Sequence, residues 1–155
     1  PSMAAGMCQK AVNIGKEIHQ GVELAVRSNP VSRLGVNANY SYLNWTISGP
    51  SNMLGVHPVR APKHKIVAIA NLDLPREIHL LATVRYESGT VTVNDSGAIV
   101  PASKFATADL GLTIPLWKGS RLQTGINNIF DRNYYYQEGF PEPGRNWHFG
   151  VRYHF

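Results

Sequence analysis

The sequence contains a single cysteine, Cys8, and few charged residues for its length. One cysteine excludes a disulfide within the chain and a metal site built from paired cysteines. Charged residues make up 16% of the sequence, whereas they make up about a quarter of a typical soluble domain. No run approaches about eighteen consecutive apolar residues, so we expect no transmembrane helix. The formal charge of +5 comes from scattered Lys and Arg residues, so we expect no nucleic-acid partner.

Targeting and catalytic motifs are missing as well. Residues 1–6 lack the basic start and the long apolar run of a signal peptide, so we expect the chain to begin inside a longer protein. Nothing resembles a nucleophile elbow, a catalytic triad or a phosphate loop. His148 and His154 would share a strand face about 20 Å apart, too far to bind one ion. We interpret His57 and His64 as polar loop residues, and we predict no enzymatic activity, no cofactor and no metal site.

What the sequence does contain is alternation of apolar and polar residues. In the last eleven positions every second residue is aromatic or apolar: Trp147, Phe149, Val151, Tyr153 and Phe155. Because successive side chains of a strand point to opposite faces, this segment is predicted to be a strand with one aromatic face and one polar face.

Six earlier segments alternate in the same way and are predicted to be strands. They lie at about 18–27, 32–48, 64–74, 78–87, 105–116 and 121–130. Residues 1–15 show no clear period and are interpreted as a loop or a frayed strand remnant. The carboxylates of the polar faces are expected to form salt bridges with arginines across strands, Asp73, Glu87 and Asp109 with Arg85, Arg121 and Arg152.

The predicted connections alternate in length. Short turns are predicted at 28–31, 75–77 and 117–120, and long loops near 49–62, 89–103 and 131–144. In an antiparallel sheet this alternation puts every short turn at one end and every long loop at the other. Outer-membrane barrels have this arrangement, with short periplasmic turns and longer extracellular loops.

The C-terminal region carries a set of ordered motifs. An Asn128-Ile129-Phe130-Asp131 box is followed by Tyr134, a Pro-x-Pro-Gly-Arg turn at 141–145 and a final Gly-x-x-Tyr-x-Phe at 150–155. This ending resembles the C-terminal end of TonB-dependent outer-membrane receptors. The resemblance implies an all-β fold, an antiparallel transmembrane β-barrel. Residues 16–155 would form its C-terminal part, about seven strands of a larger barrel of about twenty-two.

The resemblance also implies a function. Such receptors import a scarce nutrient, such as a ferric siderophore, haem, cobalamin or a sugar, and the TonB complex acts on them through a plug domain, which is expected to lie outside this chain. Further expected partners are outer-membrane lipid and the barrel-assembly machinery, which would read the aromatic ending from Trp147 to Phe155. The expected localisation is the bacterial outer membrane.

One loop contains candidate ligand-binding residues. Tyr134, Tyr135 and Tyr136 are followed by Arg145, and together they could contact a flat, anionic or aromatic ligand such as a metal chelate. The alternative is that these side chains only pack within the loop.

Two other architectures are compatible with the strand pattern. One is a small self-contained outer-membrane barrel with a structural or adhesive role, in which residues 1–15 form an eighth strand. The other is a soluble β-barrel that binds a small apolar ligand and turns residues such as Leu110, Leu112 and Ile114 inward.

Overall fold

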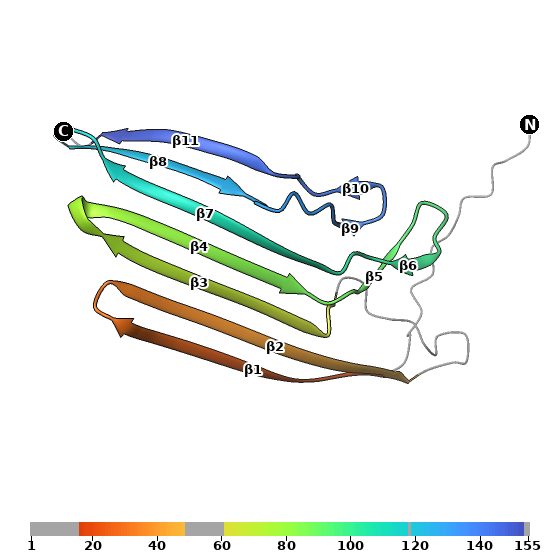
Figure 1. Cartoon of the computed structure of the whole chain (residues 1–155). Coiled ribbons are helices and arrows are strands. Elements are labelled where there is room, and N and C mark those ends of the chain that lie inside the picture. The colour runs from red at the N-terminus through yellow and green to blue at the C-terminus, as the bar shows by residue number, and fades with distance from the viewer. Residues whose placement is uncertain (1–15, 49–60, 118, 154–155) are drawn as a thin grey trace, which may run out of the picture.

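The computed structural model describes residues 16–48, 61–117 and 119–153, and these form a single antiparallel sheet with short additional strands (Figure 1). The sheet has seven strands in sequence order: β1 (Lys16–Val31), β2 (Leu34–Ser48), β3 (His64–Leu74), β4 (Ile78–Glu87), β7 (Phe105–Pro115), β8 (Ser120–Asn127) and β11 (Asn146–Tyr153). The described residues include no helix with the length and apolarity needed to cross a membrane. The predicted all-β antiparallel fold and its seven strands are confirmed.

The connections are sorted by length between the two ends of the sheet. The turns that join β1 to β2, β3 to β4 and β7 to β8 lie together at one edge of Figure 1, which we call the turn end. The turn between β3 and β4 is a 3-10 segment, η1 (Pro75–Glu77). The β4–β7 and β8–β11 connections lie at the opposite edge, the loop end, and β11 runs from the loop end to the turn end. The predicted sorting is therefore confirmed for these five connections, whereas most of the loop predicted near 49–62 lies outside the described residues.

Two predicted strand boundaries are wrong. The turn expected at 28–31 lies at residues 32–33, because β1 continues to Val31 and its pairing with β2 shifts between Ser28 and Val31. A bulge of this kind accommodates Pro30, which has no backbone N–H to donate. Strand β8 ends at Asn127 and not at Phe130. Residues 1–15, His154 and Phe155 lie outside the described residues.

The long loops also contain strands that the sequence did not indicate. The β4–β7 connection forms a hairpin from β5 (Val91–Val93) and β6 (Ile99–Pro101), and the β8–β11 connection forms one from β9 (Tyr135–Gln137) and β10 (Phe140–Pro141). Both hairpins lie at the loop end in Figure 1.

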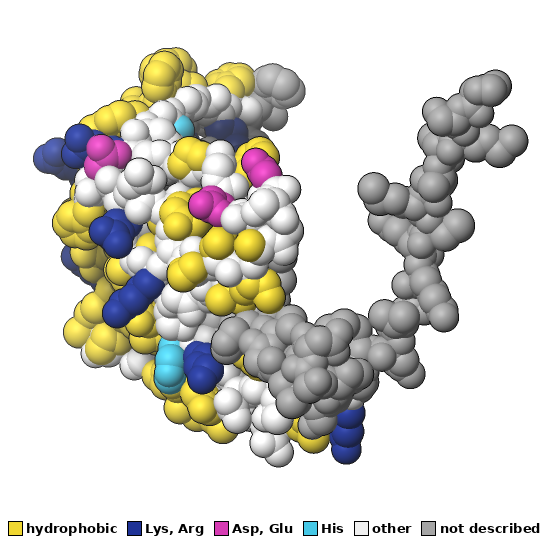
Figure 2. Space-filling view, turned by 90° about the vertical axis from the view of Figure 1, so that its right-hand side faces the viewer, with side chains coloured by type: hydrophobic (Ala, Val, Ile, Leu, Met, Phe, Trp, Pro, Cys, Tyr) yellow, Lys and Arg dark blue, Asp and Glu magenta, His cyan; other side chains and the backbone are white. Residues whose placement is uncertain are grey.

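The register separates the side chains into two faces. The apolar face is represented by a row of paired residues across five strands: Leu24, Tyr40, Ile66, Tyr86 and Ala106. The adjacent row lies on the other side, which we call the polar face: Glu23, Ser41, Lys65, Glu87 and Phe105. The apolar face contains exposed residues such as Val26, 62% exposed, and Phe149, 85% exposed. Figure 2, which looks onto the loop end, shows hydrophobic side chains along the left-hand rim.

Few of the described side chains are buried, and most of those that are lie at the loop end. They include Phe105, Thr107, Glu87, Thr92, Ala102 and Asn128. The two edge strands, β1 and β11, are exposed along their lengths, and among the described residues neither has a strand on its outer side. The described part of the chain is therefore an open sheet and not a closed barrel.

Candidate ligand-binding site at the loop end

An aromatic cluster covers the polar face at the loop end. Phe105, the first residue of β7, is 2% exposed. Its ring stacks on Tyr134 with a centroid distance of 4.0 Å and an interplanar angle of 25°. Tyr136 meets Phe105 edge-on at 5.5 Å and Tyr134 edge-on at 5.9 Å. Offset and edge-on arrangements of this kind are favourable for aromatic pairs.

Asn128 brings the loop back over the polar face. Its backbone has φ 50°, a left-handed conformation that Asn adopts more readily than most residues. The Asn128 backbone N–H donates to Asp109 Oδ1 at 2.8 Å. Its side-chain Oδ1 accepts from the backbone N–H of Arg132 at 2.9 Å, and its Nδ2 donates to the carbonyls of Arg132 and Pro143. Asn128 therefore ends β8 and holds the loop from its buried position.

Asp131 fixes the other side of the same loop. It also has a positive φ, 52°, and its Oδ1 accepts from the backbone N–H of Arg145 at 2.7 Å. A Cβ added to Gly144 would lie 2.7 Å from the same Asp131 oxygen, so any larger residue there would displace the Asp131 carboxylate from this position. The Asn-Ile-Phe-Asp box and the Pro-x-Pro-Gly-Arg turn are thus two halves of one hydrogen-bonded structure.

Charged groups surround the aromatic cluster. Lys65 Nζ lies 3.2 Å from Glu87 Oε1, and Glu87 is 6% exposed. Burial raises the pKa of the Tyr134 and Tyr136 hydroxyls above the ordinary value. For Tyr136 the neighbouring Glu87 carboxylate raises the pKa further, while Arg85, which hydrogen-bonds its side chain, opposes that effect. Both hydroxyls therefore stay protonated at neutral pH and can donate hydrogen bonds.

An open cleft of about 590 Å³ lies beside this cluster. Its lining comes from five strands (β1, β2, β3, β4 and β9) and from the β2–β3 connection: Gly21, Glu23, Ser41, Tyr42, Leu43, Pro62, Lys65, Glu87 and Tyr136. A smaller cavity of about 190 Å³ adjoins Tyr134 and is lined in part by Arg85, Asp109 and Asn128. A cleft with aromatic, amphipathic and charged walls can hold a ligand of moderate size by stacking, hydrogen bonding and charge.

The structure brings only some of the predicted ligand-binding residues together. Tyr134 and Tyr136 lie in the cluster, but the Tyr135 hydroxyl contacts the Pro101 carbonyl at 3.4 Å. The Arg145 guanidinium lies 3.5 Å from the Ile129 carbonyl and does not line the cleft. Sequence reasoning missed Phe105, Lys65 and Glu87. Alternation places all three on the polar face, but only the register shows that they are neighbours.

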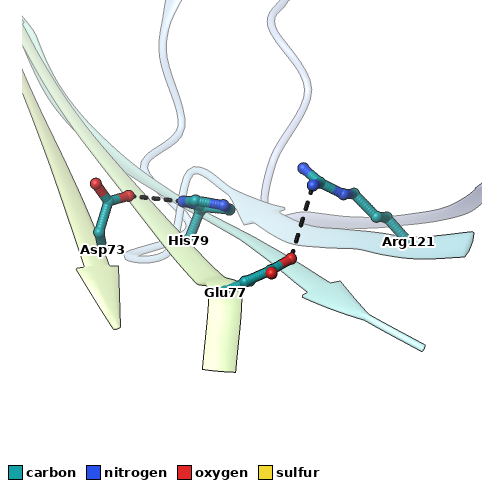
Figure 3. A network of polar contacts seen from close by, with 4 residues as sticks. All are labelled: Asp73, Glu77, His79 and Arg121. Carbon is teal, nitrogen blue, oxygen red and sulfur yellow. Dashed lines mark hydrogen bonds and ion pairs between the residues drawn. The ribbon is translucent and has the colours of Figure 1, made fainter. Parts of the chain in front are cut away.

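The predicted salt bridges between carboxylates and arginines are wrong in their pairing. Glu87 pairs with Lys65, and Asp109 accepts a backbone N–H. Figure 3 shows the turn end, where Asp73 Oδ1 lies 2.6 Å from His79 Nδ1 and Glu77 approaches Arg121 at 3.9 Å. Within the described residues no group of three or more His, Cys, Asp or Glu side chains could hold a metal ion.

Comparison with known proteins extends beyond the C-terminal motifs. A family model described as TonB dependent receptor-like, beta-barrel matches residues 2–129. The ferrioxamine receptor of Yersinia enterocolitica is 31% identical over 132 residues, and the match covers 79% of this chain and 18% of that receptor. The matched range of the family model ends at residue 129, within the Asn-Ile-Phe-Asp box, and leaves out the other C-terminal motifs. The family match therefore supports the resemblance independently of most of the motifs that suggested it.

Solved structures agree on the fold. The ferric-catecholate import receptor Fiu of E. coli K12 superposes with a TM-score of 0.73 at 21% identity, covering 91% of this chain and 21% of that chain. The ferripyoverdine receptor of Pseudomonas aeruginosa gives 0.70 at 15% identity, covering 88% and 19%. This chain spans about a fifth of the length of these relatives.

The open sheet, its exposed apolar face and the sorting of its loops are the features of an outer-membrane barrel wall. They contradict the soluble barrel, in which the apolar face would be buried inside. Combined with a family match over most of the sequence, they establish that the chain belongs to the TonB-dependent receptor-like β-barrel family of the bacterial outer membrane.

Proposed function

We propose that residues 16–155 form the C-terminal part of the barrel of a receptor that imports a ferric siderophore in a TonB-dependent manner. The observation that carries the proposal is the aromatic cluster of Phe105, Tyr134 and Tyr136 beside an open, polar cleft at the loop end. The relatives are receptors for ferrioxamine, ferric catecholates and ferripyoverdine, which favours siderophores over haem, cobalamin or sugars.

Within this proposal the chain forms wall and loop surface and catalyses no reaction. Its apolar face contacts outer-membrane lipid, and its polar face lines the lumen, where a plug domain linked to the TonB complex would lie. Tyr134 and Tyr136 are the proposed ligand contacts. Tyr135 and Arg145 remain predicted contacts, which would require their side chains to leave the Pro101 and Ile129 carbonyls.

Uptake of radiolabelled nutrients tests the proposal, with iron as the label in siderophores and haem and cobalt as the label in cobalamin. The full-length receptor is expressed in a strain that lacks other siderophore receptors, and uptake from a panel of ferric siderophores, haem and cobalamin is measured. Tyr136→Ala should weaken binding of the imported siderophore roughly fivefold, because an aromatic contact contributes about 1 kcal/mol. Phe140→Ala is the matched control, since Phe140 belongs to the same loop but is 63% exposed. Uptake of haem or cobalamin alone would refute the proposal.

The aromatic strand ending has a separate proposed role in assembly. Trp147, Phe149, Val151 and Tyr153 lie on the apolar face of the edge strand β11, and Phe155 continues the pattern in the sequence. The barrel-assembly machinery would read this ending. Deleting Phe155 from the full-length receptor should lower its amount in the outer membrane while refolding in detergent is unchanged. Unchanged membrane levels would show that this ending is not the assembly signal.

A further inference from the structure

The cleft at the loop end has an uneven distribution of charge. Three of its lining residues, Glu23, Lys65 and Glu87, belong to one row of the register, with Ser41 between the first two. Lys65 is already paired with the buried Glu87 at 3.2 Å. Glu23 is exposed on β1, and no cation among the described residues lies within ion-pair distance of it. The cleft therefore presents one uncompensated carboxylate to a ligand.

The neighbouring aromatic cluster adds further negative charge. Asp109 and Glu142 both act electrostatically on Tyr134, and Arg85 is the cation that acts against them. Among the residues that line the two cavities or act electrostatically on Tyr134, four are carboxylates (Glu23, Glu87, Asp109 and Glu142) and two are cations (Lys65 and Arg85). In a cleft whose walls exclude water on one side, such an excess repels anions and attracts cations.

We infer that the loop-end cleft takes uncharged or cationic ferric chelates and discriminates against highly anionic ones. Each hydroxamate group carries one negative charge when it binds iron, so three hydroxamates neutralise Fe³⁺. Each catecholate carries two, so three catecholates leave a complex with three negative charges. Glu23 is the specificity-determining residue in this inference, because its charge is not compensated and faces the cleft. The inference rests on the proposed siderophore import and names the class of siderophore.

Equilibrium binding to the full-length receptor in nanodiscs tests the inference. The probes are the Fe³⁺ complexes of a hexadentate trihydroxamate and of a hexadentate tricatecholate, and the readout is quenching of tryptophan fluorescence. The wild-type receptor should bind the trihydroxamate more tightly. Glu23→Gln should improve tricatecholate binding roughly three- to tenfold at low salt, because it removes a carboxylate that repels the three negative charges of the complex. The improvement should be smaller at high salt, because salt screens this repulsion. Trihydroxamate binding should stay within about twofold of wild type under the same screening.

Glu23→Lys should shift the preference further in the same direction. The matched control is Glu77→Lys, which makes the same charge change on an exposed residue at the turn end. It should leave both affinities unchanged. If Glu23→Lys does not assemble, the isosteric Glu23→Gln still decides the question.

The outcomes separate the inference from the proposed function. A receptor that binds neither chelate class overturns both. A receptor that binds the tricatecholate more tightly, or whose preference does not change in the Glu23 variants, leaves the proposed siderophore import standing but overturns the inference about charge.

Discussion

At the loop end of the sheet the polar face is covered by the β8–β11 connection and buries Phe105 and Glu87, whereas at the turn end the same face is open. The turn end contains a cleft of about 710 Å³ whose charged residues are exposed. Arg121 and Arg152 lie directly opposite each other there, and like charges in this position destabilise a sheet. The two ends of the sheet thus differ in whether a connection of the chain covers the polar face.

This difference shows where side-chain packing contributes to the structure. Along most of the wall the strands are joined by backbone hydrogen bonds and bury little apolar surface. At the loop end, by contrast, Asn128 and Asp131 fold a connection onto the sheet and create a small core. Substitutions in that core should therefore disturb the loop, and substitutions along the wall should matter chiefly through contact with lipid.

The largest effect is expected for Phe105→Ala. This change removes the most buried aromatic side chain and leaves Tyr134 and Tyr136 without their common partner, at a cost of about 3–5 kcal/mol for a buried phenylalanine. Hydrogen exchange in the full-length receptor should show loss of amide protection in residues 128–145. Protection of β8 at the turn end should be unchanged. Equal loss of protection at both ends would contradict the comparison.

Leu110→Arg should have the next largest effect. Leu110 lies midway along β7 on the apolar face, and a charge facing lipid near the midplane costs roughly 2–4 kcal/mol. The full-length variant should reach the outer membrane in reduced amount. Thr113→Arg is the matched control, because Thr113 belongs to the same strand and lines the open polar cleft. If the two variants assemble equally well, the assignment of the faces is wrong.

Asn128→Ala should weaken the loop by about 1–3 kcal/mol, the cost of leaving buried polar groups without partners. The substitution removes the side-chain bonds to Arg132 and Pro143 and puts alanine at a positive φ. Limited proteolysis should cut the β8–β11 connection faster. Asn127→Ala is a suitable comparison, since the neighbouring Asn127 makes an exposed side-chain hydrogen bond, to Asn146. Similar cleavage of both variants would argue against a special role for Asn128.

Alternation in the sequence was sufficient to predict the seven strands and the sorting of their connections, because the two-residue period depends only on local geometry. It was not sufficient to predict which residues become neighbours. The pairing of Lys65 with Glu87 depends on the register between β3 and β4, and the position of Tyr134 over Phe105 depends on a turn at Asn128.

The loop hairpins were missed for a related reason. Strand β9 is anchored by hydrogen bonds between Tyr135 and Ser103, residues that are far apart in the sequence, and no local propensity indicates that contact. The turn between β1 and β2 was misplaced because Pro30 is read as a turn residue, although here it lies in a bulge within an edge strand. A long-range contact determined the local structure of β9, and the pairing of two neighbouring strands determined the position of the β1–β2 turn.

The smallest expected effect is a dependence on alkaline pH that is confined to the loop end. Burial raises the folded-state pKa of Tyr134 and Tyr136 above the ordinary value near 10. At a pH between the ordinary pKa and the raised pKa, the folded loop therefore keeps hydroxyl protons that the opened loop releases. The resulting stabilisation is complete below about pH 10 and is lost as pH rises through the raised pKa.

Amide protection in residues 128–145 should fall over that range while protection of β8 at the turn end changes less. The double variant Tyr134→Phe and Tyr136→Phe should lose this pH dependence, because phenylalanine cannot ionise. The ionisation of these two tyrosines can be followed by phenolate absorbance. If their phenolate forms at or below the ordinary tyrosine pKa, the loop does not bury them.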